Sequence, residues 1–350
     1  MIRVLVVDDS AFSRQTIKKM LESDPDIEVA AVASDGIDAM AKTLRLKPDL
    51  ITLDFEMPEM DGFSFLRWLM KQRPTPVIMV SSYSDTKTVF KALELGAVDF
   101  IAKPSRRASM ELRNIEKDLL AKVKGIKALN MDVLSRNLQL LETASSAPEA
   151  AARKSDVEVV AVGASTGGPP ALQIILSKLP PEFPGIVISQ HMPKGFTGPL
   201  AERLDTLSKM RVKEAENGDE VQTGRVLICP GGYHMSVKKR RDVPYVLLRE
   251  AVYEDRYIPS IDVMMKSAAE CCGKNLMGVV LTGMGNDGKE GMLAIKAGGG
   301  YTIAESEETS VVFGMPAEVI GAGAAKKVLP LTEIPGEMVR VAVGEGQHGR

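Results

Sequence analysis

Short apolar runs alternate with helical patterns over residues 1–122. The apolar runs predict buried strands, because they are rich in valine, leucine and isoleucine and end at polar residues. They cover residues 4–7, 29–33, 50–53, 77–80 and 100–102. Helical spacing of apolar residues appears between them, for example at 11–23 and 36–46. This alternation predicts a parallel sheet covered by helices, which is a doubly wound α/β domain.

A longer helical pattern follows this domain. From Met110 onward apolar residues recur every seven positions, at Leu112, Leu119, Ile126, Val133 and Leu140. We expect one long helix that runs from the first domain into a linker, residues 123–156. A dimerising coiled coil is less favoured, because few heptads are complete. Within the linker, residues 143–155 are rich in alanine, serine, proline and glutamate without an apolar period, which predicts a flexible tether.

A second α/β alternation occupies residues 157–343. Its expected strands are 157–162, 186–189, 226–229, 245–248, 278–281 and 301–304. Its expected helices are 171–179, 197–208, 262–272 and 289–297. The pattern predicts a second doubly wound, Rossmann-like parallel sheet. The glycine-rich tail, residues 344–350, is expected to be disordered.

Composition narrows the functional classes. The chain has 350 residues, of which 45% are hydrophobic and 26% charged, and its formal net charge is −2. Such a charge gives no general attraction to nucleic acid or to an anionic membrane. The three cysteines form neither a disulfide framework nor a zinc pattern, and no apolar run reaches membrane-spanning length. We therefore expect a cytoplasmic protein, acting as a monomer.

Polar residues follow the strands of the first domain. Asp8 and Asp9 follow the first strand, Asp54 the third, Ser81 the fourth and Lys103 the fifth. The carboxyl ends of parallel strands meet at one edge of a sheet, so these groups should converge. Two or three carboxylates can hold Mg²⁺, and the cation with the ammonium would offset the charge of a phosphoryl group. Asp54 could then attack a phosphodonor.

Two further residues fit a phosphorylation switch. The Ser81 hydroxyl could bind the new phosphoryl oxygens, and Phe100 could report the state by changing rotamer. With LDFEMP at 53–58 and MDG at 60–62, residues 1–122 resemble the receiver domain of response regulators, a flavodoxin-like fold. The resemblance implies that Asp54 is the phosphorylation site and that a histidine kinase is the phosphodonor.

A serine lies at a sharp turn in the second domain. Residues 163–168 are GASTGG, directly after an expected buried strand and before a helix. A serine at such a corner, here Ser165, exposes its hydroxyl and can act as a nucleophile.

A serine nucleophile needs a base, and His191 follows a neighbouring strand at its carboxyl end. His234 is better explained as a loop histidine bonded to backbone. Asp287 could orient His191 from a third strand end, although it could instead be only the N-cap of the following helix. Backbone N–H groups near Met284 could bind an oxyanion. The order Ser, His, Asp differs from that of the α/β-hydrolases, so we do not expect that fold.

Several motifs of the second domain are similar to those of the CheB family of chemotaxis protein-glutamate methylesterases. They are GASTGGP at 163–169, QHMP at 190–193, FT at 196–197, PG at 230–231, HM at 234–235, PSID at 259–262, LTGMGNDG at 281–288 and VFGMP at 312–316. The resemblance implies a triad of Ser165, His191 and Asp287, with Thr166 and Met284 beside the site. Ile258 departs from the pattern, where a basic residue is expected.

The resemblance also implies hydrolysis of glutamyl methyl esters on chemoreceptors, with release of methanol and a related glutamine deamidation. It implies Mg²⁺ in the receiver domain and no cofactor in the catalytic domain. Contact with the membrane would then occur only through receptors. A DNA-binding response regulator would need a small basic helix-turn-helix output, and a dinucleotide-binding module would need Gly-x-Gly-x-x-Gly spacing. The second domain is instead a large α/β pattern in a chain of pI about 6.1, and the turn at 163–168 lacks that glycine spacing.

Overall fold

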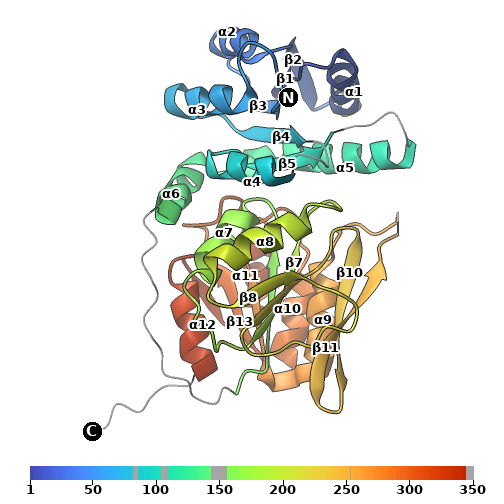
Figure 1. The fold of residues 1–350 in the computed structure, drawn as a ribbon, viewed down its shortest axis with the longest axis vertical. Helices are drawn as coiled ribbons and strands as arrows, with labels where there is room; N and C mark the ends of the chain where they lie inside the picture. Colours follow the sequence, from blue (N-terminus) through green and yellow to red (C-terminus); the bar gives the residue numbers. More distant parts are fainter. Residues whose placement is uncertain (82–85, 104–108, 143–155, 253, 344–350) are drawn as a thin grey trace. The chain divides into compact units, whose positions relative to one another are not determined.

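The computed structural model describes residues 1–81, 86–103, 109–142, 156–252 and 254–343 (Figure 1). The expected tether and the expected disordered tail lie outside these ranges. The chain divides into two compact units, Met1–Leu138 and Gln139–Arg350. Both are α/β units built on parallel sheets, which confirms the predicted fold class.

The first unit contains a five-stranded parallel sheet with the order β2-β1-β3-β4-β5. Its strands are β1 (Ile2–Val7), β2 (Ile27–Ala33), β3 (Leu50–Asp54), β4 (Val77–Ser81) and β5 (Asp99–Ala102). Its helices are α1 (Ala11–Glu22), α2 (Gly36–Leu46), α3 (Gly62–Gln72), α4 (Thr86–Glu94) and α5 (Ser109–Gly125). Helix α1 packs beside α5, and α2 packs beside α3. The aliphatic faces of β1, α1 and α5 form a buried core, for example Val4, Ile17 and Leu119.

The prediction of a single long helix after this sheet is wrong. Helix α5 ends at Gly125, a 3₁₀ turn covers Ile126–Ala128, and a separate helix α6 spans Met131–Glu142. The side chain of Asn130 accepts hydrogen bonds from the N–H groups of Asp132 and Val133, both at 3.1 Å. Asparagine is a strong helix N-cap, so Asn130 starts a new helix where the heptad pattern continues unbroken.

The second unit contains a seven-stranded parallel sheet with the order β14-β13-β12-β6-β7-β9-β8. Its strands are β6 (Val159–Ala164), β7 (Gly185–Gln190), β8 (Arg211–Glu214), β9 (Arg225–Ile228), β12 (Leu276–Val280), β13 (Tyr301–Glu305) and β14 (Lys327–Leu329). Its helices are α7 (Gly168–Leu176), α8 (Thr197–Leu207), α9 (Ile261–Cys272), α10 (Lys289–Ala297), α11 (Met315–Gly321) and α12 (Ile334–Val343), with a 3₁₀ turn at Gly273–Asn275. The strand order reverses between β6 and β12, which is the position where open α/β sheets bind ligands.

An antiparallel hairpin stands apart from this sheet. It consists of β10 (Tyr233–Arg240) and β11 (Val243–Glu250) and packs against α9. The strand predicted at 245–248 therefore exists, but it belongs to the hairpin and not to the parallel sheet. The basic run Lys238–Arg241 forms the end of β10 and the tip of the hairpin, where Arg241 and Asp242 have positive φ.

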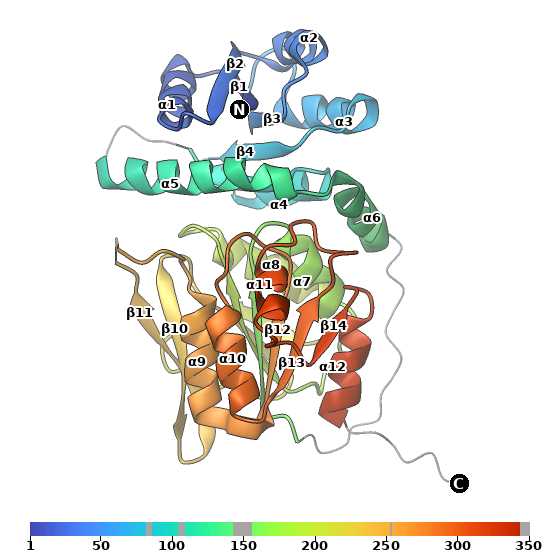
Figure 2. The same cartoon turned by 180° about the vertical axis from the view of Figure 1, so that it is seen from behind.

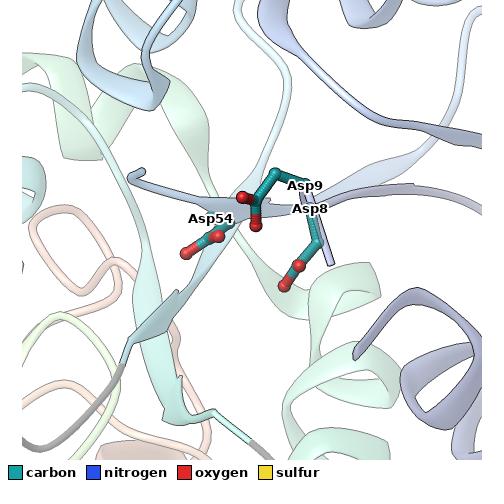
Figure 3. A group of neighbouring side chains, drawn as sticks. All are labelled: Asp8, Asp9 and Asp54. Carbon is teal, nitrogen blue, oxygen red and sulfur yellow. The ribbon is translucent and has the colours of Figure 1, made fainter. Parts of the chain in front are cut away.

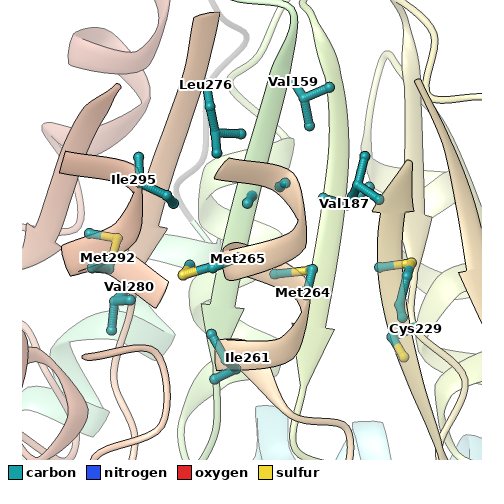
Figure 4. Packing of buried hydrophobic residues seen from close by; sticks show 14 of the residues in the cluster. Val159, Val187, Cys229, Ile261, Met264, Met265, Leu276, Val280, Met292 and Ile295 are labelled. Carbon is teal, nitrogen blue, oxygen red and sulfur yellow. The ribbon is translucent and has the colours of Figure 1, made fainter. Parts of the chain in front are cut away.

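The helices of the second unit cover both faces of its sheet. Helices α7, α8 and α12 lie on one face, and α9, α10 and α11 lie on the other (Figures 1 and 2). Figure 4 shows how side chains of α9 and α10, among them Met264, Met265, Met292 and Ile295, fill the space above β6 and β12. This apolar layer packs the two helices against the sheet. No helix within the described ranges is long and apolar enough to cross a bilayer.

Candidate functional site

The turn after β6 places Ser165 at the strand-order reversal. The Ser165 N–H donates to the Thr282 carbonyl at 3.1 Å, which ties the turn to the end of β12. The Ser165 carbonyl accepts from the Gly168 N–H at 2.8 Å and from Gln190 Nε2 at 2.9 Å. Both neighbouring strands therefore fix the backbone of Ser165, while its side chain remains half-buried.

His191 lies between Ser165 and Asp287. Its backbone N–H donates to the Ala164 carbonyl at 3.0 Å, which extends the pairing of β6 and β7 by one residue. The imidazole Nδ1 is 3.1 Å from Ser165 Oγ, and Nε2 is 2.9 Å from Asp287 Oδ2. With the carboxylate as acceptor, Nε2 carries the proton and Nδ1 presents its lone pair to the serine. The two nitrogens have the opposite assignment in serine proteases of the trypsin type.

Asp287 is almost completely buried, yet it remains an acceptor of hydrogen bonds. Burial opposes ionisation, but the hydrogen bond from His191 and backbone bonds from Asp262 and Ile261 outweigh it and hold the pKa of Asp287 below its ordinary value. The N-cap of α10 is Gly288, without a side-chain cap. The carboxylate of Asp287 instead binds the first N–H groups of α9. The simple N-cap role considered for Asp287 is therefore not what the structure contains.

Thr166 and Met284 lie beside the serine. Thr166 is buried, and its carbonyl accepts from Thr282 Oγ1 at 2.9 Å. Gly283 approaches the nucleophile so closely that a Cβ on it would lie 2.6 Å from Ser165 Cβ. The next residue, Met284, makes no intramolecular hydrogen bond through its N–H to any described residue. That N–H remains the candidate oxyanion donor expected from the sequence.

Tyr257 covers the imidazole, and the sequence reasoning did not identify it. Its ring stacks on His191 with centroids 5.2 Å apart and an interplanar angle of 6°. Its hydroxyl donates to Asn286 Oδ1 at 3.0 Å. The guanidinium of Arg256 lies over the Tyr257 ring, 4.9 Å from its centroid. No periodic pattern marks a residue whose role depends on a stack between distant segments, so only a three-dimensional structure could find it.

A buried carboxyl group, that of Glu305, is hydrogen-bonded to the segment that contacts the Ser165 turn. Glu305, at the end of β13, accepts the Thr282 N–H at 2.7 Å. Burial raises the pKa of Glu305 to about 7, against the hydrogen bonds from Thr282 and Thr309. Because Thr282 bonds to both Ser165 and Thr166, Glu305 holds the junction on which the serine rests.

His234 is excluded as the base by its own contacts. Its Nε2 lies 2.8 Å from Asp255 Oδ2, and its Nδ1 accepts the Ser260 N–H at 3.0 Å. Both nitrogens are thus engaged away from the serine. The expected backbone bond is present, although His234 lies on strand β10 and not in a loop.

Three carboxylates gather at the carboxyl edge of the first sheet, as Figure 3 shows for Asp8, Asp9 and Asp54. One oxygen from each lies within 4.8 Å of the others. Burial and the charge of Asp54 raise the pKa of Asp8 to about 6, and burial raises the pKa of Asp54. Oxygens around one Mg²⁺ are up to about 4 Å apart. A small closing movement of these side chains would let them hold a divalent cation, which would relieve their crowded negative charge.

Lys103 reaches into the same cluster. Its Nζ is 2.6 Å from Asp54 Oδ2 and 3.4 Å from Asp8 Oδ2. Burial works against the ammonium, but the hydrogen bond that Lys103 donates to Asp54 and the charges of Asp8, Asp54 and Asp9 raise the pKa of Lys103. Phe100 is buried, and the Lys122 ammonium lies over its ring. The backbone of Ser81 ends β4, whereas its side chain lies outside the described part.

Comparisons with known proteins agree with this architecture. A family model described as "CheB methylesterase" matches residues 160–338, and one described as "Response regulator receiver domain" matches residues 4–114. "Protein-glutamate methylesterase/protein-glutamine glutaminase 3" of Geobacter sulfurreducens is 50% identical over an alignment of 359 positions. The alignment covers 97% of this chain and 97% of the relative. "Protein-glutamate methylesterase/protein-glutamine glutaminase" of Pyrococcus abyssi is 44% identical over an alignment of 359 positions. The alignment covers 100% of this chain and 96% of the relative.

A solved structure matches the second unit. The "CheB methylesterase catalytic domain" of Thermotoga maritima superposes with a TM-score of 0.52 at 43% identity, covering 53% of this chain and 99% of that one. A receiver domain followed by this α/β domain defines a response regulator with an enzymatic output. The chain belongs to the CheB methylesterase family.

Proposed function

We propose that the chain is a phosphorylation-controlled protein-glutamate methylesterase that acts on chemoreceptors through Ser165, His191 and Asp287. The observation that carries the proposal is the continuous relay from Ser165 Oγ through His191 to Asp287, with distances of 3.1 and 2.9 Å. The names of the relatives supply the substrate, a glutamyl methyl ester.

In the acylation step Ser165 Oγ attacks the ester carbonyl while His191 Nδ1 takes the hydroxyl proton. Asp287 holds the Nε2–H and stabilises the imidazolium that forms. The negative charge on the carbonyl oxygen is met by the Met284 N–H beside Thr166. The imidazolium then returns its proton to the leaving oxygen, so methanol departs and the glutamyl group remains on Ser165.

In the deacylation step His191 takes a proton from water, and the resulting nucleophile attacks the acyl-enzyme. The imidazolium then gives its proton to Ser165 Oγ as the acyl bond breaks, so the products are the glutamate carboxylate and free Ser165. A glutamine amide follows the same route with ammonia as the leaving group. We therefore propose protein-glutamine deamidation as a second reaction of this site.

We propose Asp54 as the phosphorylation site and a histidine kinase as its donor. Asp8, Asp9 and Asp54 would hold Mg²⁺, which supplies charge neutralisation for the phosphoryl group. Lys103 lies 2.6 Å from Asp54 and offers a second positive charge. Ser81 and Phe100 are the proposed switch residues. All three cysteines are free thiols, as expected for the cytoplasm in which we place the protein.

The decisive assay is methanol release from methylated chemoreceptor, with ammonia release from an unmodified receptor measured in parallel. A small phosphodonor with Mg²⁺ should increase the rate. Deleting residues 1–138 should raise basal activity if the receiver restricts access to Ser165. A truncated protein no faster than the unphosphorylated full chain would show that the receiver does not mask the site. Methanol release from neither form would refute the proposed function.

A further inference from the structure

The carboxylate that orients the base is held by a helix to which it does not belong. Asp287 precedes α10, yet Oδ2 accepts the Ile261 N–H at 2.7 Å and Oδ1 accepts the Asp262 N–H at 2.9 Å. These are the first N–H groups of α9. The hydroxyl of Ser260, the N-cap of α9, lies 3.3 Å from Oδ1. The N-terminus of α9 therefore sets the position and the negative charge of Asp287.

Helix α9 returns a carboxylate to α10. Asp262, in the first turn of α9, accepts through Oδ1 the N–H groups of Gly288 at 3.0 Å and Gly291 at 2.7 Å. Gly288 directly follows Asp287 in the chain. The carboxylate before α10 thus accepts hydrogen bonds from the start of α9, and the carboxylate in α9 accepts hydrogen bonds from the start of α10. Together these bonds hold the segment that carries Asp287.

The packing leaves little room for another arrangement. A Cβ on Gly291 would lie 2.5 Å from Met265 Cβ and 3.3 Å from Asp262 Oδ1, so glycine permits the close approach of the two helices. Burial, followed by the charge of Asp287, raises the pKa of Asp262, while Lys266 opposes that effect. Asp262 lies near a second buried carboxylate, that of Asp287. Keeping Asp262 ionised at this position therefore has an electrostatic cost. The hydrogen bonds from the Gly288 and Gly291 N–H groups offset part of that cost.

We propose that Asp262 is a positioning residue of the hydrolytic site, an inference that rests on the proposed function. It contacts neither Ser165 nor His191 in any recorded hydrogen bond. It acts by fixing the Asp287 segment, and through Asp287 the ring of His191. Without it, the α10 start loses two acceptor contacts and the Asp287 carboxylate can shift relative to Nε2. A misplacement of about 1 Å costs about 100-fold in rate.

The test compares Asp262→Ala and Asp262→Asn in the full chain. Asn keeps an oxygen that can accept the Gly288 and Gly291 N–H groups, whereas Ala removes it. We expect Asp262→Ala to lower kcat for methanol release about 10- to 100-fold with little change in KM, and Asp262→Asn to recover most of kcat. Asp205→Ala is the matched control, because Asp205 also accepts a backbone N–H, that of Val212 at 2.7 Å, outside the triad.

A second measurement does not depend on turnover. The proton on His191 Nε2 gives an imidazole N–H resonance that can be followed by NMR, and loss of the signal in His191→Gln assigns it. We expect Asp262→Ala to shift or broaden this resonance and Asp262→Asn and Asp205→Ala to preserve it. Unchanged kcat and an unchanged resonance in Asp262→Ala would overturn the inference. A wild-type protein without methanol release but with the Asp262-dependent resonance would instead refute only the proposed function.

Discussion

The buried carboxyl group of Glu305 makes the stability of the second unit depend on pH. Its pKa rises from an ordinary 4.5 to about 7 in the folded protein because the side chain is fully buried. The folded state therefore holds a proton that the unfolded chain releases between these two values. As the pH rises from 4.5 towards 7, the free energy of unfolding decreases. Above pH 7 it decreases no further through this group, and the whole loss remains.

Replacement of Glu305 by glutamine removes this cost. The amide oxygen can still accept the Thr282 N–H, now 2.7 Å from the carboxylate, but the side chain never ionises. One pKa unit corresponds to about 1.4 kcal/mol. The free energy of unfolding of the variant, relative to wild type, should therefore increase by about 2–3 kcal/mol as the pH rises from 5 to 8. For a unit of this size the gain corresponds to about 5–10 °C in Tm.

Thermal unfolding of the full chain, followed by circular dichroism and by tryptophan fluorescence, measures this gain. The only tryptophan, Trp68, lies on α3 in the first unit, so its transition serves as an internal control. We expect the second transition of Glu305→Gln to move up relative to wild type at pH 8 and far less at pH 5. The Trp68 transition should not move. An offset of the same size at both pH values would refute the assignment of the titration to Glu305.

Three further predictions concern the first unit. Asp54→Asn should abolish the stimulation of methanol release by a small phosphodonor and leave basal release intact; stimulation that persists would exclude Asp54 as the acceptor. Asp8→Asn should weaken Mg²⁺ binding at least about tenfold, measured by calorimetric titration, because a charged ligand is lost; equal affinity would move the metal site elsewhere. Asn130→Ala should cost about 1 kcal/mol in urea unfolding through loss of the α6 N-cap, and an unchanged midpoint would mean that the cap contributes nothing.

The strand pattern of the sequence is sufficient to predict that the candidate site residues lie together. Ser165, His191 and Asp287 each follow a buried strand, and parallel strands end at one edge, so their convergence is a property of the topology. The same reasoning grouped Asp8, Asp9, Asp54 and Lys103. Hydrophobic runs predicted these strands well, because fully buried parallel strands are nearly continuous in aliphatic residues.

Other features depend on contacts that a pattern does not contain. The heptad spacing continued across Asn130, where a single side-chain cap divides the helix. Strand β8 was missed, because it is short and includes three charged residues. Asp262 and Glu305 act through backbone N–H groups that lie 23 to 29 positions away in the chain, such as the Gly291 N–H for Asp262, 29 residues distant. Only the folded arrangement identifies such residues.

The central claim is that Ser165 is the nucleophile of an ester hydrolase. The most direct measurement is methanol release from methylated receptor by wild type, Ser165→Ala and Ser177→Ala. Ser177 is the C-cap of α7, and its hydroxyl donates to the Ile174 carbonyl at 3.2 Å, so its variant is a matched serine-to-alanine control. The account predicts release by wild type and Ser177→Ala and none by Ser165→Ala. Release by Ser165→Ala at the wild-type rate would contradict it.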